Sequence, residues 1–277
     1  MSISVIKADG KVEGFSVEKL AESLVRSGLQ RETALEVAKE VEAGLPSLVH
    51  TRRIFKLVKK ILRSINHAST MRYSLKRAIS ELGPSGYPFE RFLSKVLRAY
   101  GYQTELNLQM EGWCVSHEVD ILARKDGDSF AIECKYHNDG GKPVDVKIAL
   151  YVHSRAEDLK KAYRKGRLSE PIKEGWLATN TRLTSDAIKY SECSGLKVIS
   201  WRYPEGKGLE RLIEQKRLYP ITVLSPQKRS ILKELLKKDI VLASEIASMG
   251  EEEFLSKSGL DEPTSRALKQ QAERLCL

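Results

Sequence analysis

Val119-Asp120-Ile121-Leu122-Ala123 and Phe130-Ala131-Ile132-Glu133-Cys134-Lys135 are the two stretches that decide the fold of the middle of the chain. Both are rich in the apolar and β-branched residues that form strands with a buried face. The residues between them, Lys125-Asp126-Gly127-Asp128, favour the positive backbone angles of a tight turn. The segment therefore predicts an antiparallel β-hairpin.

Three charged side chains are expected to meet at the end of this hairpin. Residues two apart in a strand share a face, so Glu133 and Lys135 lie together. Pairing with the first strand brings Asp120 beside Glu133, while Val119 and Ile121 point to the opposite face. Two adjacent carboxylates repel each other unless a cation lies between them, and oxygen ligands suit a hard ion such as Mg²⁺. Lys135 could orient an attacking water and stabilise charge developing on a phosphate.

Two further residues near the hairpin are candidates for the same site. A helix expected before the hairpin carries Glu90 beside an apolar stripe, so we assign this carboxylate a supporting role. His117 could act as a metal ligand or a general base, and it ranks below the carboxylates. In the competing interpretation, Glu133 and Lys135 form a simple ion pair at a sheet edge and Asp120 is solvated.

The composition is that of a globular protein of the cell interior. With 277 residues and 41% apolar content, the chain can form one large domain or two to three small ones. Its first residues lack the basic region and apolar block of a secretory signal, so we expect a cytoplasmic protein with no membrane partner. Because no C-x-x-C pair is present, we expect reduced thiols at Cys114, Cys134, Cys193 and Cys276.

The charge of the chain favours a polyanionic partner. Lysine and arginine outnumber aspartate and glutamate by 47 to 37, a net charge of +10, although many proteins with such a surplus bind no nucleic acid. The excess lies in residues 1–82, with 15 basic against 9 acidic, and in residues 83–220, with 23 against 19. Residues 221–277 are balanced at 9 of each. DNA is therefore expected to contact the first two segments.

The first segment ends at a cluster of helix breakers in residues 82–86. Before them, apolar alternation around the Asp9-Gly10 turn predicts a β-hairpin. A helix should follow that Ser16 caps and Gly28 ends, and Thr51 is expected to cap a later helix. This segment is therefore predicted to be mainly α-helical with one β-hairpin.

The whole chain is predicted to be a multidomain α/β protein. We expect a first domain at 1–82, a central α/β core with a mixed sheet at 83–220, and a small all-α module at 221–277. The elements expected in the central domain are helices at about 88–99 and 146–165, strands at about 104–110, 117–123, 129–136, 176–179 and 197–201, and a helix capped by Thr184.

The motifs of the central segment occur together in one known family. They are Phe89-Glu90-Arg91-Phe92, His117-Glu118-Val119-Asp120-Ile121-Leu122, Glu133-Cys134-Lys135 after a thirteen-residue step, and the polar turn at 178–184. In order and spacing they resemble the Mrr-like branch of the restriction endonuclease superfamily over about residues 85–202. The resemblance implies DNA cleavage with Mg²⁺ or Mn²⁺ held by Asp120 and Glu133, with Lys135 and Glu90 completing the catalytic centre.

The first segment carries a second set of motifs. They are Val5-Ile6-Lys7, Asp9-Gly10-Lys11, Phe15, Lys19-Leu20 and Met71-Arg72-Tyr73. They resemble the ATP-cone, a nucleotide-sensing module, over about residues 3–80. The resemblance implies ATP or dATP as a regulatory ligand, with Lys7, Lys11 and Lys19 as phosphate-binding residues. Ala8 stands where the family usually has a second basic residue, which predicts weaker or altered selectivity; a fold retained without its ligand is the alternative.

The last segment contains Ser258-Gly259-Leu260 before a helix, which resembles one half of a helix-hairpin-helix, although Pro263 replaces the expected second turn. Such a turn can present backbone amides to a phosphate. A structural or self-association role explains this neutral segment equally well.

Together these features predict a nucleotide-regulated, metal-dependent endodeoxyribonuclease that hydrolyses phosphodiester bonds. The alternative is a catalytically silent, nucleotide-sensing DNA-binding regulator, against which the presence of Lys135 argues. A third class, a protein-interaction scaffold, would make the carboxylates accidental. Cutting both strands of a duplex requires two catalytic centres, which favours a homodimer.

Overall fold

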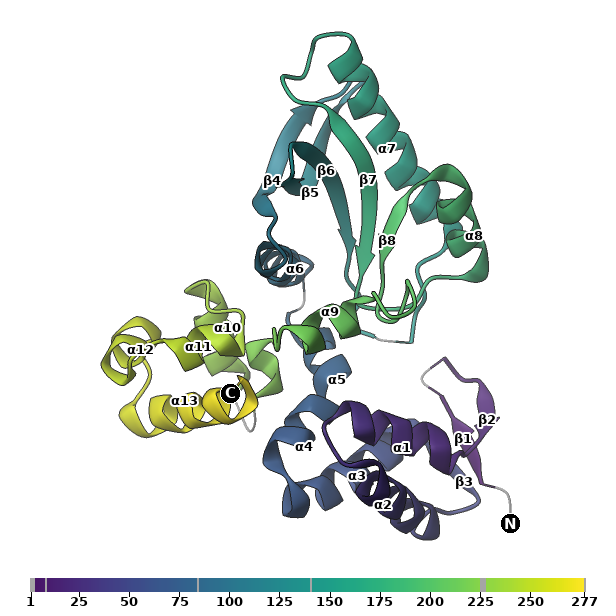
Figure 1. The fold of residues 1–277 in the computed structure, drawn as a ribbon, viewed down its shortest axis with the longest axis vertical. Helices are drawn as coiled ribbons and strands as arrows, with labels where there is room; N and C mark the ends of the chain where they lie inside the picture. Colours follow the sequence, from purple (N-terminus) through teal and green to yellow (C-terminus); the bar gives the residue numbers. More distant parts are fainter. Residues whose placement is uncertain (1–2, 8, 84, 140, 225–227, 277) are drawn as a thin grey trace.

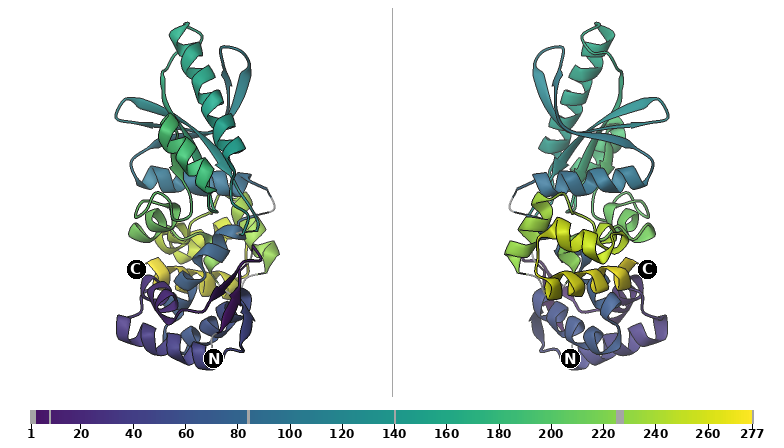
Figure 2. Two further views of the ribbon diagram at one scale, coloured as in Figure 1. Left: turned by 90° about the vertical axis from the view of Figure 1, so that its right-hand side faces the viewer. Right: turned by 90° about the vertical axis from the view of Figure 1, so that its left-hand side faces the viewer.

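The computed structural model describes residues 3–7, 9–83, 85–139, 141–224 and 228–276. They form three parts, with the N-terminal module at one end and a five-stranded sheet at the other (Figure 1). The C-terminal helices lie alongside the junction between those two parts (Figure 2). The predicted multidomain α/β fold is confirmed.

The N-terminal module combines helices with a small sheet of order β2-β1-β3, in which β1 is antiparallel to β2 and parallel to β3. As predicted, the Ser16 hydroxyl accepts a hydrogen bond from the backbone N–H of Lys19, and Gly28 follows the helix with a φ of +98°. The elements are β1 (Ser4–Ile6), β2 (Val12–Gly14), α1 (Val17–Arg26), α2 (Arg31–Ala43), β3 (Leu48–His50), α3 (Thr51–Ile65), α4 (His67–Tyr73) and α5 (Leu75–Ser80).

The predicted cap at Thr51 is wrong. The N-cap of α3 is His50, which makes no side-chain capping bond, and Thr51 is the first residue of the helix. The cause is β3, a strand that the sequence analysis did not predict. Because His50 pairs with Ile6 in a parallel ladder, the extended backbone runs up to this residue and the helix begins directly after it.

The central domain is built on a mixed sheet of order β4-β5-β6-β7-β8. The first three strands are antiparallel, whereas β6, β7 and β8 are parallel. Figure 1 shows α7 running along the sheet and α6 near its lower end. The elements are α6 (Tyr87–Ala99), β4 (Gln103–Glu111), β5 (Ser116–Lys125), β6 (Asp128–Lys135), α7 (Val146–Arg164), β7 (Ile172–Thr179), α8 (Ser185–Ser194), β8 (Lys197–Ile199) and α9 (Leu209–Gln215).

The two faces of the sheet are buried by different helices. Ile132 and Trp176 pack into the cluster that contains the apolar residues of α6. Ala131 packs instead with Leu159 of α7, and Leu177 packs with residues of α7 and α8. Successive residues of one strand therefore face opposite layers, as the period of a strand requires.

The alternation of faces changes at Asp120. Val119 packs on the α7 side and Ile121 on the α6 side, so the prediction that these two residues share a face is wrong. Across from Asp120 on β4, Asn107 adopts a left-handed backbone with a φ of +53°. Such a residue twists the ladder locally, and asparagine tolerates the conformation better than most residues.

The C-terminal part is helical, as predicted. Its elements are the short 3-10 helix η1 (Ile221–Val223), α10 (Arg229–Lys237), α11 (Ala243–Ser248), α12 (Glu251–Ser258) and α13 (Glu262–Cys276). Gly259 ends α12 with a φ of +63°. Among the helices that the structure describes, none is long and apolar enough to cross a bilayer.

One apolar core joins all three parts. Ile79 of α5, Phe92 of α6 and Leu268 of α13 are fully buried in the same cluster. The buried Thr222 hydroxyl also donates to the carbonyl of Ala78 at 2.7 Å. Helix α5 is therefore an integral part of the core on which the central and C-terminal parts also pack. Pro84, in the predicted boundary after α5, lies outside the described residues.

Candidate active site and interdomain cleft

The predicted hairpin is present, and its strands part at the residues expected to carry the chemistry. Asp126 and Gly127 form the turn with φ values of +53° and +82°. The ladder between β5 and β6 runs from this turn to the pair Ile121–Ile132. One residue further, Oδ2 of Asp120 accepts a hydrogen bond from the backbone N–H of Cys134 at 2.7 Å. The Asp120 carboxylate therefore lies against the backbone just after Glu133.

Glu133 is a buried carboxylate held between two cations. Only 5% of the residue is exposed, and its two oxygens bond to Lys135 and to Arg155 of α7. Arg155 also donates to the carbonyl of Glu118 at 2.7 Å and bonds to the Tyr151 hydroxyl. The structure thus brings together Glu133 and Lys135 as predicted, and it adds Arg155 and Tyr151.

The position of Arg155 in the sequence could have identified it as a residue of this site. It lies three residues after Val152 and four before Leu159, both of which are buried on the inner face of α7. A charged residue within the apolar stripe of a helix needs a buried partner, because an unpaired charge is costly there. That partner is Glu133.

Acidic charge dominates the centre despite these two cations. Burial, together with the charge of Glu133, raises the pKa of Asp120 to about 6. Burial also raises the pKa of Glu90 to about 7, and repulsion from Asp120, Glu118 and Glu133 adds to this effect. Glu90 on α6 thus lies within the electrostatic reach of the hairpin end, as predicted. The raised pKa values mean that the ionised carboxylates repel one another at this position. An additional cation would reduce that repulsion and would therefore bind favourably.

The donor chemistry of the centre fits a hard divalent ion. Asp120 and Glu133 present the oxygen donors that Mg²⁺ prefers, and Glu90 supplies a third carboxylate nearby. Within the described ranges, however, no three acidic, histidine or cysteine side chains are arranged to hold a metal as they stand. Both oxygens of Glu133 are engaged by Lys135 and Arg155. Metal binding there would require an oxygen of Glu133 to exchange its partner.

The Lys135 ammonium is positioned by the same carboxylates. Burial lowers its pKa, but the hydrogen bond to Glu133 and the charge of Asp120 outweigh this effect, and the pKa is raised overall. Its side chain is one-third exposed and lies 5.9 Å from the ring centre of Tyr151. Lys135 is therefore charged at neutral pH and remains accessible to a ligand.

His117 makes structural contacts of its own. Its Nε2 lies 2.8 Å from Oδ2 of Asp158, which also accepts the backbone N–H of Cys114. Asp158 therefore holds the loop before β5 against α7. The structure shows no contact of His117 with Asp120 or Glu133 among the described residues, so its candidate role at the centre gains no support.

The polar turn at 178–184 is tied directly to the strand that carries the centre. The Asn180 side chain accepts the backbone N–H of His137 at 2.9 Å and donates to the carbonyl of His137 at 2.7 Å. As predicted, Thr184 caps α8 by accepting the backbone N–H of Ala187. The exits of β6 and β7 are thus locked together two residues beyond Lys135.

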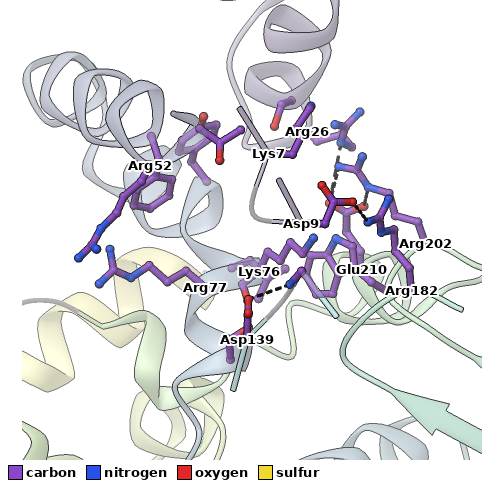
Figure 3. A pocket seen from close by; sticks show the side chains of 18 of the residues that line it. Lys7, Asp9, Arg26, Arg52, Lys76, Arg77, Asp139, Arg182, Arg202 and Glu210 are labelled. Atoms are coloured by element: carbon purple, nitrogen blue, oxygen red, sulfur yellow. Dashed lines mark hydrogen bonds and ion pairs between the residues drawn. The ribbon is translucent and has the colours of Figure 1, made fainter. Parts of the chain in front are cut away.

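A large basic cleft lies between the N-terminal module and the central domain (Figure 3). Its volume is about 910 Å³, and its walls hold nine lysines and arginines against five aspartates and glutamates. The basic residues are Lys7, Lys11, Arg26, Arg52, Arg72, Lys76 and Arg77 from the first module, and Arg182 and Arg202 from the central domain. The volume is at the upper end for a small-molecule site.

The cleft includes two of the three predicted nucleotide-binding lysines. Lys7 and Lys11, from either side of the hairpin turn, line the cleft. Lys19 is exposed on α1 and does not belong to the lining. Ala8, the departure expected to alter selectivity, lies outside the described residues.

Comparisons with known proteins divide the chain in the same order. Residues 3–81 match the ATP cone domain family, residues 83–205 match a restriction endonuclease family of the Mrr type, and residues 219–276 match the family described as AF1548-like, C-terminal. The predicted combination of an ATP cone with an endonuclease domain is confirmed.

Two relatives each cover about two thirds of the chain. An Archaeoglobus fulgidus protein described as uncharacterized is 35% identical over 185 residues, which is 66% of this chain and 99% of the relative. The crystal structure of a protein of unknown function, AF1548, superposes with a TM-score of 0.58 at 34% identity and covers 69% of this chain and 98% of that one. The chain therefore belongs to the AF1548-like family and combines an ATP-cone domain, an Mrr-like restriction endonuclease domain and an AF1548-like C-terminal domain.

Proposed function

We propose that this protein is a Mg²⁺-dependent DNA endonuclease whose activity responds to ATP or dATP. The observation that carries the proposal is the meeting of Asp120, Glu133 and Lys135 where β5 and β6 part, with Glu90 in electrostatic reach. This constellation lies in a domain that matches restriction endonucleases. Mn²⁺ is expected to replace Mg²⁺, because both accept oxygen ligands.

In the proposed mechanism, Asp120 and Glu133 would hold the cation and Glu90 would support it. When bound, the ion supplies positive charge that stabilises the reacting phosphate. The Lys135 ammonium donates hydrogen bonds to the attacking water and to the phosphate oxygens, where negative charge grows in the transition state. Arg155 holds one oxygen of Glu133 in place.

The regulatory part of the proposal rests on the ATP-cone match and on Lys7 and Lys11 at the cleft. A triphosphate requires several cationic donors, which the cleft offers. We include a homodimer in the proposal, since cleavage of both strands of a duplex requires two centres. A cytoplasmic location is also part of the proposal.

The test is cleavage of supercoiled plasmid, linear duplex and branched DNA by the full-length protein with Mg²⁺, Mn²⁺ or EDTA. We expect cleavage of at least one substrate with either metal and none with EDTA. Glu133→Ala, prepared by the same procedure, should not cut, which excludes a contaminating nuclease. Cleavage of equal rate by Glu133→Ala would refute the proposed centre.

A silent regulator is the second candidate, and one observation favours it. Both oxygens of Glu133 are already neutralised by basic side chains of the same domain. Nucleotide-dependent DNA binding without cleavage of any of the three substrates, in a protein that binds no Mn²⁺, would establish this alternative.

A further inference from the structure

The cleft is shared between two domains rather than contained in one. Lys7, Arg72 and Lys76 reach it from the ATP-cone domain, while Arg182 and Arg202 reach it from the nuclease domain. Figure 3 shows Asp9, Arg182 and Arg202 gathered on one side of the cleft. A ligand that fills the cleft would contact both domains.

An anion already bridges the domains at this place. Oδ2 of Asp9, in the hairpin turn, pairs with Nη2 of Arg182 at 3.0 Å. Oδ1 of the same carboxylate accepts the backbone N–H of Lys11 at 3.2 Å. One donor comes from each domain, so this position is suited to a phosphate group, which carries more charge and more acceptor oxygens than a carboxylate.

Several cations of the cleft have no acidic partner. Within the described ranges, no ion pair holds Arg52, Arg72 or Lys76, and the buried Nε of Arg72 has no hydrogen-bond partner. Burial lowers the pKa of Lys76, and the charges of Arg182 and Arg202 lower it further. Positive charge is therefore crowded here beyond what the acidic side chains compensate, which is the condition for binding a polyanion.

Arg72 owes its position to a glycine. A Cβ atom at Gly28, which follows α1 with a φ of +98°, would lie 2.7 Å from Nη1 of Arg72. The absent side chain lets the guanidinium lie over the end of α1 and line the cleft. The planar guanidinium suits bidentate contact with phosphate.

We propose that the triphosphate of a nucleotide is bound jointly by the two domains, with Arg182 and Arg202 of the nuclease domain completing the site and the phosphates replacing Asp9 at Arg182. This inference rests on the proposed nucleotide binding and assigns it two residues outside the ATP-cone. Arg202 is at present held by Glu210, with Nε–Oε2 and Nη2–Oε1 distances of 2.6 and 3.2 Å. A ligand that replaces Asp9 at Arg182 binds one interdomain arrangement more tightly than another, as regulation requires.

The site has short connections to the catalytic strand. Helix α5 carries Lys76 at the cleft, and the carbonyl of Ser80 at its end accepts the Tyr136 hydroxyl at 2.7 Å. Tyr136 directly follows Lys135 and stacks on Phe89, with ring centres 5.6 Å apart. A shift of α5 on nucleotide binding would therefore reach residues adjacent to Lys135 and Glu90.

The test is calorimetric titration of the full-length protein with ATP and with inorganic triphosphate. Arg182→Ala and Arg202→Ala are each expected to weaken ATP binding about ten-fold or more, since each removes a charged donor to phosphate. Both side chains are more than half exposed, so the variants should fold. Asp9→Asn removes the competing carboxylate and should tighten binding. Arg266→Gln is the matched control, because it breaks an exposed ion pair with Glu262 on α13.

The outcomes separate this inference from the function on which it rests. If Arg182→Ala and Arg202→Ala bind ATP like the wild type, the shared site is refuted while nucleotide binding stands. If the wild type gives no heat at millimolar ATP, the nucleotide part of the proposed function fails and the shared site fails with it. Because the readout is binding, absence of nuclease activity would leave the result intact.

Discussion

The proposed catalytic centre and the interdomain cleft are built in opposite ways. At the centre, Glu133 is buried and its charge is matched by Lys135 and Arg155 of the same domain. In the cleft, the ion pair between Asp9 and Arg182 joins two domains, and Arg182 is 57% exposed. The comparison teaches that a buried pair fixes geometry within one domain, whereas an exposed pair across domains can be exchanged for a ligand at little cost.

The largest expected effect is on catalysis at the centre. Lys135→Ala should lower the rate of DNA cleavage by about 10²- to 10³-fold, since one transition-state donor is lost. Asp120→Ala and Glu133→Ala should abolish cleavage. DNA affinity should stay within a few-fold, because binding draws on many basic groups. Cleavage rates and ATP titration together test whether the two sites are built from separate residues.

The matched control for this substitution is Lys173→Ala. Lys173 forms an exposed ion pair with Asp128 at the opposite end of the same sheet, at 2.5 Å. It should cut like the wild type. Full activity of Lys135→Ala would remove Lys135 from the mechanism, and loss of ATP binding by the same variant would contradict the separation of centre and cleft.

The second effect is on stability. Arg155→Met removes one partner of the buried Glu133 and should lower the free energy of unfolding by about 3 kcal/mol. Arg182→Ala breaks the exposed interdomain pair and should leave the denaturation midpoint unchanged. Urea denaturation of the three proteins measures both. Equal losses of unfolding free energy in Arg155→Met and Arg182→Ala would mean that the buried and the exposed ion pair contribute equally to stability.

The third effect is on DNA affinity. Raising the salt concentration from about 50 to 200 mM should weaken DNA binding by about ten-fold or more, since bound phosphates release counterions. Asp120→Ala should show the same salt slope as the wild type, because it changes the centre and not the basic surface. Fluorescence anisotropy with a labelled duplex provides the measurement. A flat salt dependence would exclude DNA as the main partner.

The smallest effect concerns the hydrogen bond between Tyr136 and α5, which we propose as the connection between the two sites. Tyr136→Phe removes the hydrogen bond to the carbonyl of Ser80 and should cost about 1 kcal/mol of stability. Cleavage without nucleotide should be nearly unchanged, while the response of cleavage to ATP should shrink a few-fold. Tyr163→Phe, at an exposed position of α7, serves as control. An undiminished ATP response would exclude this contact as a route between cleft and centre.

The elements that the sequence predicted well are those determined by neighbouring residues. The hairpin depends on the Asp126-Gly127 turn, and α1 and α8 depend on the caps Ser16 and Thr184. Because Asp120 and Glu133 flank that single turn, their proximity could also be predicted. Local chemistry was sufficient in each case.

The features that the sequence did not reveal depend on distant segments. Strand β3 forms by pairing with β1, which displaces the cap expected at Thr51. The twist at Asn107 places Val119 and Ile121 on opposite faces. Arg182 reaches Asp9 across more than 170 residues of chain. None of these contacts produces a periodic pattern in the sequence from which it could be predicted.

The apolar core that α5 shares with α6 and α13 has a consequence for how the protein unfolds. A sensor joined by a flexible linker would melt separately from its enzyme and give two transitions. Here, removal of the first 82 residues would strip Ile79 and Leu82 from the interior and expose the groups that pack on them. Helix α5 should therefore lose structure together with the central and C-terminal parts, whereas the core around Val5, Leu24 and Val58 is a separate cluster, so the ATP-cone domain shares one of its helices with the thermodynamic unit it would regulate.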